Sequence, residues 1–181
     1  MRATSRLLLP TLLALGALAG PAQAALKPGD AAPDFSADAA LAGEPYRFQL
    51  AEALKKGPVV LYFYPKAFTS GCTVEAHQFA EATPKFQQLG VTVIGISNDD
   101  IATLKRFSVE ACRKQFAVAA DAGAKVMKAY DAKLLMMADT ADRISYFIVP
   151  PGRIAAVHAK LSADGHVEAM MKAAEAWKAG R

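Results

Sequence analysis

Two short apolar runs constrain the fold of this chain more than any other feature. Val59–Tyr64 reads VVLYFY and Val91–Ile96 reads VTVIGI, and both runs are continuous, rich in β-branched residues and of strand length. Such runs are typical of strands buried on both faces of a sheet. The segment between them, Val74–Leu89, is rich in helix formers, so the pattern predicts a strand, a helix and a parallel strand joined by a right-handed crossover. Pro84 inside this segment predicts a kink or break near Thr83.

The rest of the chain extends this pattern to an α/β fold with a mixed sheet and helices on both faces. Apolar residues recur at helical spacing from Ile101 to Ala111, behind N-capping residues, and predict a second helix. The pair Pro151-Gly152 suits the middle of a type II turn and predicts an antiparallel hairpin. The hairpin strands are Ser145–Val149 and Ile154–His158, and the other predicted elements are a strand at Val118–Ala120, a helix at Ala124–Tyr130 and a C-terminal helix containing Val167 to Trp177.

The first 24 residues are interpreted as a targeting segment outside the fold. Arg2 and Arg6 precede an apolar stretch, Leu7–Ala19, and Ala22-Gln23-Ala24 follows, which is the pattern of a cleaved secretory signal peptide. The stretch is too short for a membrane-spanning helix, which needs roughly 20 residues. We therefore expect cleavage after Ala24, a mature domain from 25 to 181 and no membrane anchor. Because no cysteine precedes the cleavage site, the segment is typical of bacterial periplasmic proteins, whose compartment is oxidising.

Composition and charge exclude several classes of protein. The chain has 181 residues, of which 53% are hydrophobic, so it can bury one core of ordinary size. Neither a disordered chain nor a disulfide-stapled miniprotein fits that composition. The formal net charge is only +4, and the basic residues form no block interleaved with aromatics, which argues against nucleic acid as a partner.

The segment with the clearest chemistry joins the first predicted strand to its helix. Pro65–Thr73 reads PKAFTSGCT and follows the carboxyl end of a central strand, where open α/β sheets bind ligands. Cys72 is expected in the first turn of the helix, where unpaired backbone N–H groups and the positive end of the helix dipole favour a thiolate. Cys72 is therefore a candidate nucleophile, and a small buried side chain is the alternative interpretation.

Four residues, in order, resemble those of the peroxiredoxins. Pro65, Thr69 and Cys72 match a Pro-x-x-x-Thr-x-x-Cys motif, and Arg143 directly precedes the run ISYFIV. The resemblance extends from about Lys27 to the C-terminus and is strongest to the bacterioferritin comigratory protein subgroup, also called peroxiredoxin Q. It implies a thioredoxin-like α/β fold, with a central mixed sheet flanked by helices, and a thiol peroxidase that uses no metal, haem or flavin.

The resemblance also implies a role for each of these residues. The Cys72 thiolate would attack one oxygen of a hydroperoxide, forming a sulfenic acid and releasing water or an alcohol. Arg143 would stabilise the thiolate and the charge that develops across the O–O bond, and the Thr69 hydroxyl would orient the peroxide. Pro65 would screen the pocket from water. Backbone N–H groups at Gly71 and Cys72 would donate further hydrogen bonds.

The second cysteine has two interpretations. Many members of the subgroup carry a resolving cysteine five residues after the nucleophile, where this chain has His77. Cys112 lies 40 residues after Cys72, near the end of the second predicted helix, where some peroxiredoxins keep their resolving cysteine. By resemblance we expect an intrachain Cys72–Cys112 disulfide, which requires local unfolding because bonded cysteines have Cα atoms about 4.4 to 6.8 Å apart. The alternative is a structural Cys112 and an external thiol that resolves the sulfenic acid.

Two further classes of function are compatible with the same fold. A thiol-disulfide oxidoreductase of thioredoxin type carries a second cysteine three residues after the first, where this chain has Glu75. A non-catalytic binding domain would hold Cys72 and Cys112 in a static disulfide. For the peroxidase, we expect a thioredoxin-like protein or a small thiol as reductant. By resemblance we also expect a monomer or a weak dimer.

Other polar residues give weaker signals. Glu75 either pairs with a cation beside the site or is a favourable acid in the first helical turn. His77 diverges from Cys72 by about 140° around the helix, so a surface or packing role is expected. The cysteines and His77 lack the paired spacing of a zinc site, so no metal is expected. His158 and His166 are assigned no role.

Overall fold

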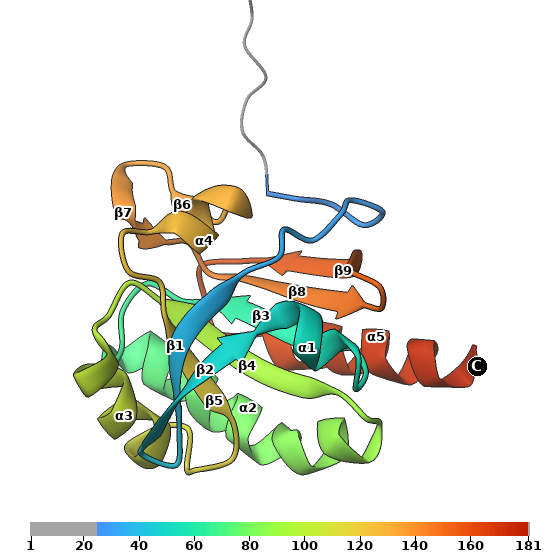
Figure 1. The fold of residues 1–181 in the computed structure, drawn as a ribbon, viewed down its shortest axis with the longest axis horizontal. Coiled ribbons are helices and arrows are strands. Elements are labelled where there is room, and N and C mark those ends of the chain that lie inside the picture. Colours follow the sequence, from blue (N-terminus) through green and yellow to red (C-terminus); the bar gives the residue numbers. More distant parts are fainter. Residues whose placement is uncertain (1–24, 181) are drawn as a thin grey trace, which may run out of the picture.

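A seven-stranded mixed sheet organises the computed structural model, which describes residues 25–180 (Figure 1). The strand order is β2-β1-β5-β4-β3-β8-β9, and β6 and β7 form a separate two-stranded sheet. The strands are β1 (Ser36–Leu41), β2 (Glu44–Gln49), β3 (Val59–Phe63), β4 (Thr92–Ser97), β5 (Ala117–Ala120), β6 (Lys133–Leu134), β7 (Met137–Ala141), β8 (Ile144–Val149) and β9 (Arg153–Ala159). The helices are α1 (Leu50–Leu54), α2 (Ser70–Gln88), α3 (Ile101–Glu110), α4 (Lys125–Ala129) and α5 (His166–Ala179). The predicted signal segment, residues 1–24, lies outside the described residues.

The two apolar runs form adjacent central strands, as the sequence predicts. β3 and β4 pair in parallel, and α2 is the crossover between them. All five residues of β3 are buried, because successive side chains enter different cores. Leu61 and Phe63 belong to one hydrophobic cluster, and Val60 and Tyr62 belong to the other. The predicted α/β class with a mixed sheet is therefore confirmed.

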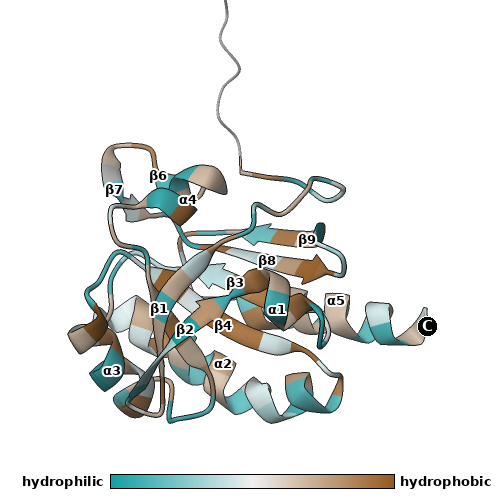
Figure 2. Cartoon of the chain, viewed as in Figure 1, coloured by the Kyte–Doolittle hydropathy of each residue, from teal (hydrophilic) through white to brown (hydrophobic). Residues whose placement is uncertain are grey.

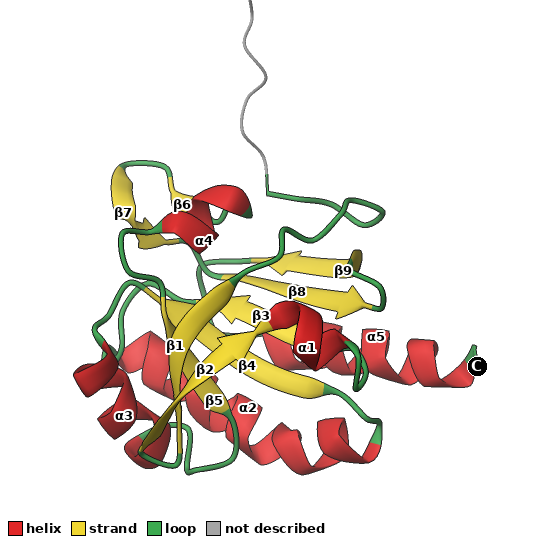
Figure 3. Ribbon diagram, in the orientation of Figure 1, coloured by secondary structure: helices red, strands yellow, loops and turns green. Residues whose placement is uncertain are grey.

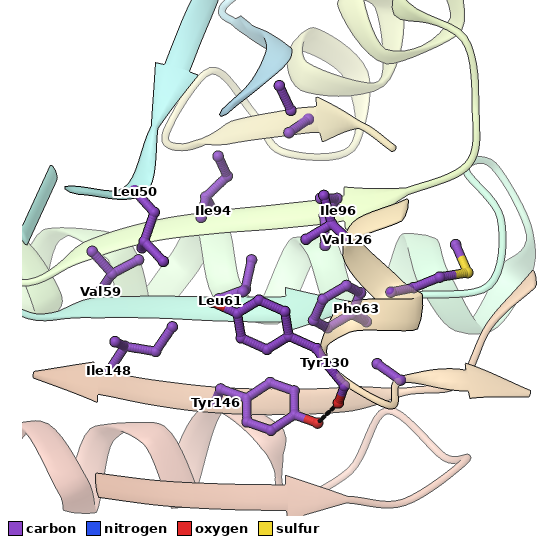
Figure 4. Close-up of a cluster of buried hydrophobic side chains, with 14 of the residues drawn as sticks. Leu50, Val59, Leu61, Phe63, Ile94, Ile96, Val126, Tyr130, Tyr146 and Ile148 are labelled. Carbon is purple, nitrogen blue, oxygen red and sulfur yellow. Dashed lines mark hydrogen bonds between the residues drawn. The ribbon is translucent and has the colours of Figure 1, made fainter. Parts of the chain in front are cut away.

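Helices cover both faces of the sheet (Figure 3). On one face α2, α3 and α5 pack over a cluster that includes Phe79, Phe107 and Met170. On the other face α1 and α4 close a second cluster, in which the Tyr146 hydroxyl donates to the Tyr130 carbonyl at 2.9 Å (Figure 4). Figure 2 shows β4 as mainly hydrophobic, whereas α2 and α5 alternate between hydrophobic and hydrophilic turns. This pattern is expected when strands are buried and helices are amphipathic.

The sheet topology brings together two segments that are far apart in sequence. β8 pairs with β3 in antiparallel orientation, and Ile144 lies opposite Phe63. The residue before β8, Arg143, therefore lies beside the loop that follows β3. α5 packs against β8, β9 and α2, so its first residues approach the same region.

The predicted break in α2 is wrong. The helix runs without interruption from Ser70 to Gln88 and includes Pro84. Phe79, Thr83 and Phe86 are buried on both sides of the exposed proline, so one face of the helix stays packed throughout. Burial of that face offsets the one backbone hydrogen bond that a proline removes.

The predicted hairpin is confirmed, but its turn is not type II. β8 and β9 pair in antiparallel orientation, and the Gly152 N–H donates to the Val149 carbonyl at 2.8 Å. The peptide between Pro150 and Pro151 is cis, which places Pro151 at the third position of a type VI turn. The proline pair, and not Pro151-Gly152, occupies the centre of the turn.

The remaining predicted elements agree with the structure to within a few residues. α3, β5, α4 and α5 lie where the sequence pattern placed them. Within residues 25–180, no helix is both long enough and apolar enough to span a membrane.

Candidate active site

Cys72 lies in the first turn of α2, immediately after the loop that leaves β3. Its side chain is buried, at 2% exposure. The first backbone hydrogen bond of the helix joins the Thr73 N–H to the Thr69 carbonyl at 2.9 Å. The N–H groups of Gly71 and Cys72 therefore precede the hydrogen-bonded ladder, at the positive end of the helix. A thiol in this position is close to donors that stabilise negative charge.

The Arg143 guanidinium places a positive charge beside the Cys72 sulfur. Its Nη2 donates to the Cys72 Sγ at 3.4 Å, and its Nε donates to the Leu161 carbonyl at 2.8 Å. Its Nη1 forms a buried ion pair with Glu75 Oε2. Each donor atom of the guanidinium thus has its own partner, which fixes the orientation of this planar group.

Gly71 allows the guanidinium to approach the helix. A Cβ atom at this position would lie 3.3 Å from Arg143 Nη2, which is closer than ordinary van der Waals contact. A side chain at this position would therefore require Arg143 Nη2 to shift by a few tenths of an ångström. The role that the sequence suggested for Gly71 rested only on its backbone N–H, and the close approach adds a second reason for glycine.

The Thr69 hydroxyl is orientated by its own loop. Thr69 is the N-cap residue of α2 by position, but its side chain makes no capping hydrogen bond. Its Oγ1 instead donates to the Lys66 carbonyl at 2.9 Å. Since the hydroxyl proton is used in this bond, the oxygen is left to act as an acceptor. Pro65, at the start of the loop, is half-buried.

The loop between β3 and α2 is anchored by Asp99, whose role the sequence did not reveal. Asp99 Oδ2 accepts from the Ala67 N–H at 2.7 Å and from the Ser97 hydroxyl at 2.8 Å. Phe68 adopts a left-handed conformation, with φ of 64°. A left-handed non-glycine residue is costly, so the surrounding contacts hold the loop in a defined shape. The position of Asp99 after a central strand was the available signal.

Glu75 and His166 extend the charged cluster behind Arg143. Both side chains are fully buried, and His166 Nδ1 lies 3.7 Å from Glu75 Oε1. Burial raises the pKa of Glu75 to about 8, although the charge of Arg143 opposes this shift. Burial also lowers the pKa of His166 to about 4. Of the two interpretations of Glu75, pairing with a cation is confirmed, whereas no pattern in the sequence pointed to His166.

Cys112 occupies an apolar environment. It directly follows Ala111, the C-cap residue of α3, so the prediction that it lies near the end of this helix is confirmed. Its side chain is fully buried. Burial raises the pKa of its thiol well above the usual range. Cys72 and Cys112 belong to the same hydrophobic cluster, and both are free thiols.

Tyr62 on β3 and Tyr64, the residue directly after β3, lie near both cysteines. Burial raises the pKa of each phenol well above its usual range, and charge on Cys112 or Cys72 would raise it further. Both rings therefore stay neutral. Among the described residues, both hydroxyl oxygens are buried without a hydrogen-bond partner, which is unfavourable for polar atoms in the interior.

The other candidates lie outside this cluster. His77 is half-buried on α2, and within residues 25–180 no hydrogen bond or ion pair to its side chain is found. Over the same described residues, no group of three or more His, Cys, Asp or Glu side chains is arranged to hold a metal ion.

Comparison with known proteins identifies the family of this chain. Residues 28–157 match the model of the AhpC/TSA family. The chain belongs to this family. It is 30% identical to peroxidoxin BcpB from Mycobacterium tuberculosis, whose crystal structure superposes with a TM-score of 0.72 over 83% of this chain and 97% of that one. The family also confirms the resemblance to the peroxiredoxins that the motif implied.

Two further relatives refine the assignment. The chain is 40% identical over 100 residues to the chloroplastic peroxiredoxin Q of Oryza sativa subsp. japonica, a match that covers 55% of this chain and 44% of the relative. The chain therefore spans less than half the length of that relative. A structure of peroxiredoxin Q from Xanthomonas campestris has a TM-score of 0.67 at 24% identity, over 78% of this chain and 90% of that one, and supports the fold. Together they place the chain in the Bcp and peroxiredoxin Q subgroup.

Proposed function

We propose that this protein is a thiol-dependent peroxidase that reduces hydrogen peroxide and alkyl hydroperoxides at Cys72. One observation carries the proposal: the Arg143 guanidinium donates to the Cys72 Sγ at 3.4 Å, at the positive end of α2. A buried thiol with a fixed cation and free backbone donors is suited to react as a thiolate. Membership of the AhpC/TSA family, and relatives named as peroxiredoxins, support the same activity.

The first step forms a sulfenic acid. The Cys72 thiolate attacks one peroxide oxygen, an S–O bond forms, and the O–O bond breaks. The second oxygen leaves with the bonding electrons and takes up a proton to become water or an alcohol, so no metal, haem or flavin is required. Arg143 and the Gly71 N–H stabilise charge on the two oxygens, while the Thr69 oxygen accepts from the peroxide O–H. Pro65 keeps water from the reacting atoms.

In the second step Cys112 resolves the sulfenic acid. Its sulfur attacks the Cys72 sulfur, and a disulfide and water are formed. Cys112 is fully buried, so the segment that carries it must open before it can ionise and reach Cys72. Arg113 and Lys114, directly after it, have φ of 50° and 63°. Left-handed residues of this kind cost about 1–2 kcal/mol each, so the native form of this segment is destabilised relative to an opened one.

A second candidate is a one-cysteine peroxidase in which Cys112 is structural. The complete burial of Cys112 and the high pKa of its thiol favour this interpretation. In that case a small external thiol attacks the sulfenic acid directly.

Intact mass under denaturing, thiol-trapping conditions separates these candidates. Reduced protein is measured before and after one equivalent of hydrogen peroxide, beside Cys72→Ser and Cys112→Ser. The proposal expects wild type to lose two hydrogens, neither variant to do so, and Cys112→Ser to gain oxygen. Oxygen gained at Cys72 with a free Cys112 establishes the one-cysteine enzyme. A wild type that is unchanged by peroxide refutes the peroxidase.

The cellular setting is part of the same proposal. The predicted signal segment supports export with cleavage after Ala24, and we propose that the mature protein acts in the periplasm. The reductant there is a thioredoxin-like protein or a small thiol, which returns the two electrons to the disulfide. By resemblance we propose a monomer or weak dimer. N-terminal sequencing of protein from a periplasmic fraction tests the first claim, and sedimentation tests the last.

A further inference from the structure

The connection between α3 and β5 is held by buried side chains at both ends. Cys112 is fully buried and Phe116 is 3% exposed, whereas the three residues between them are exposed. The Lys114 N–H donates to the Ser108 carbonyl at 2.9 Å. The Gln115 N–H donates to the Cys112 carbonyl at 2.9 Å. These backbone bonds join the connection to α3 and to itself, so contact with the rest of the molecule depends on side chains.

Phe116 packs on an aromatic pair that belongs to other elements. Tyr62 on β3 and Phe79 on α2 stack on each other, with ring centroids 4.4 Å apart and planes at 17°. The Phe116 ring meets both at steep angles, with centroid distances of 5.9 Å to Tyr62 and 6.3 Å to Phe79. Edge-on ring contacts of this kind are favourable beyond the area that they bury. Phe116 therefore fastens the connection to β3 and to α2.

The aromatic pair itself is fixed in the fold. Gly95 on β4 lies opposite Tyr62 in the sheet, and a Cβ atom there would lie 2.7 Å from Tyr62 Cζ. The Tyr62 ring thus occupies the space that a side chain on β4 would take. Phe79 is seven residues after Cys72 on the same buried face of α2. The surface on which Phe116 packs is therefore continuous with the helix face that carries the reacting thiol.

A second contact joins the connection to α2, but it is weaker. Arg113 Nη1 lies 3.0 Å from Glu81 Oε1, and the two side chains are 49% and 67% exposed. Ion pairs this exposed contribute little to stability, because water screens the charges and both side chains lose freedom. Burial of an aromatic ring contributes more. Of the two contacts, the Phe116 ring is the one that holds the connection closed.

We propose that the packing of Phe116 on its two aromatic neighbours sets how often Cys112 is released from the core. Only three residues separate Cys112 from Phe116, so the connection opens as one unit and the ring leaves its contacts when the thiol does. Phe116 is then a positioning residue for the resolving step, because it acts on the reaction through Cys112. This inference rests on the proposed role of Cys112 as the thiol that resolves the Cys72 sulfenic acid.

The two steps of the reaction should respond differently to this packing. Attack of the Cys72 thiolate on peroxide uses groups that are in place in the closed form, so its rate does not depend on Phe116. The resolving step depends on the fraction of molecules in which the connection is open, since the buried Cys112 thiol can neither ionise nor reach the sulfenic acid. A substitution that weakens the packing raises this fraction and speeds only the second step.

Alkylation of Cys112 measures the release of the thiol directly. The chain has two cysteines, so in protein that carries Cys72→Ser the mass added by iodoacetamide reports the exposure of Cys112, without peroxide. Phe116→Leu keeps an apolar side chain but removes the edge-on ring contacts, and the rate of alkylation should rise about five- to tenfold. Arg113→Gln should change this rate less than about twofold.

Phe86→Leu is the matched control, because it makes the same change in the same hydrophobic cluster. Phe86 is fully buried on α2, and its ring centroid lies 6.5 Å from that of Phe79. It should destabilise the protein, as urea denaturation measures, and still leave the alkylation rate within about twofold of the wild type. Equal acceleration by both variants would mean that Cys112 is reached only by global unfolding, and this result overturns the inference. Unchanged alkylation in Phe116→Leu, or in Phe116→Met should the leucine variant not fold, also overturns it.

The same variants with both cysteines present test the effect on the reaction. After one equivalent of hydrogen peroxide, the disulfide should form faster in Phe116→Leu by the factor seen for alkylation. The reaction with peroxide itself, measured on protein that carries Cys112→Ser, should keep its wild-type rate. A protein that shows the alkylation pattern and forms no disulfide refutes the proposed resolving step and leaves the control of Cys112 by Phe116 in place. Disulfide formation at one rate in the wild type and in Phe116→Leu refutes only the inference.

Discussion

Cys72 and Cys112 lie in the same hydrophobic cluster, and both are buried free thiols, but their electrostatic surroundings are opposite. Cys72 is in the first turn of α2 and accepts from Arg143, whereas Cys112 follows the last turn of α3, at the negative end of a helix dipole. Among residues 25–180, no charged side chain forms a hydrogen bond to Cys112. Burial therefore does not distinguish the two thiols. The polar groups around each sulfur distinguish them.

The two segments also differ in how firmly they are held. Cys72 is part of a 19-residue helix, and the loop before it is anchored by Asp99. Cys112 begins a short connection in which two consecutive residues, Arg113 and Lys114, have positive φ. The stable segment suits a site that must keep its geometry, and the strained one suits a sulfur that must move.

Replacing Arg143 by glutamine should make Cys72 behave more like Cys112. Loss of the cation removes the group that stabilises the thiolate and the leaving oxygen, so the rate of reaction with hydrogen peroxide should fall by about 100- to 1,000-fold. Competition kinetics on protein carrying Cys112→Ser measures this first step alone. Arg47→Gln, on exposed β2, is the control and should keep the wild-type rate. A fall of less than tenfold would mean that the helix terminus is sufficient without Arg143.

The charged cluster beside Cys72 should also make stability depend on pH. Burial raises the pKa of Glu75 from its ordinary 4.5 to about 8, so its contribution is complete below pH 4.5 and is lost as the pH rises through about 8. Burial lowers the pKa of His166 from 6.5 to about 4, so its contribution is complete above pH 6.5 and is lost as the pH falls through about 4. Between pH 6.5 and 8, only the Glu75 contribution changes.

Over that interval the free energy of unfolding should fall by about 2 kcal/mol more in the wild type than in Glu75→Gln. Urea denaturation at the two ends of the interval measures the difference. Glu168→Gln, exposed on α5, is the matched control and should behave as the wild type. Equal pH dependence in the wild type and Glu75→Gln would show that Glu75 is already ionised at the lower pH.

Serine substitutions at Cys72 and Cys112 test the difference between the two thiols through the free energy of unfolding. A hydroxyl at position 72 can accept from Arg143, whereas one at position 112 lies in a mainly apolar cluster in which no described charged side chain contacts the cysteine it replaces. Cys112→Ser should therefore cost about 1–3 kcal/mol of unfolding free energy relative to Cys112→Ala, and Cys72→Ser should cost less than this relative to Cys72→Ala. Urea denaturation of the four reduced proteins gives the two differences. If they are equal, Cys112 is not in the apolar environment described above.

The parts of the fold that could be predicted are those whose signal is local. The runs that form β3 and β4 are apolar throughout, and their burial follows from that pattern. β1 reads SADAAL, and alanine favours helices over strands, so nothing local identified it. Its small side chains are explained only by the sheet, in which Ala39 lies opposite Ala119 on β5.

The residues of the candidate site also divide into those with a local sequence signal and those without one. Thr69, Gly71 and Cys72 are neighbours in sequence, and a strand followed by a helix was enough to bring them together. Arg143 was identified by resemblance, and the antiparallel pairing of β8 with β3 explains how it arrives. His166 depends on how α5 docks against α2 and β8, which no periodicity in the sequence encodes.

Gly71→Ala should produce the smallest effect of these substitutions. It tests whether glycine is required for the approach of Arg143 or for the stability of the helix. The added Cβ would lie 3.3 Å from Arg143 Nη2 and displace the guanidinium by a few tenths of an ångström. Because a 1 Å misplacement can cost about 100-fold, the rate with peroxide should fall by about three- to tenfold. Alanine is the better helix former, so the free energy of unfolding should be unchanged or higher by up to about 1 kcal/mol. Ser70→Ala, exposed in the same turn, should leave the rate unchanged. A slower but equally stable protein assigns glycine to the approach of Arg143, whereas a parallel loss of rate and stability would mean that the first turn itself had been disrupted.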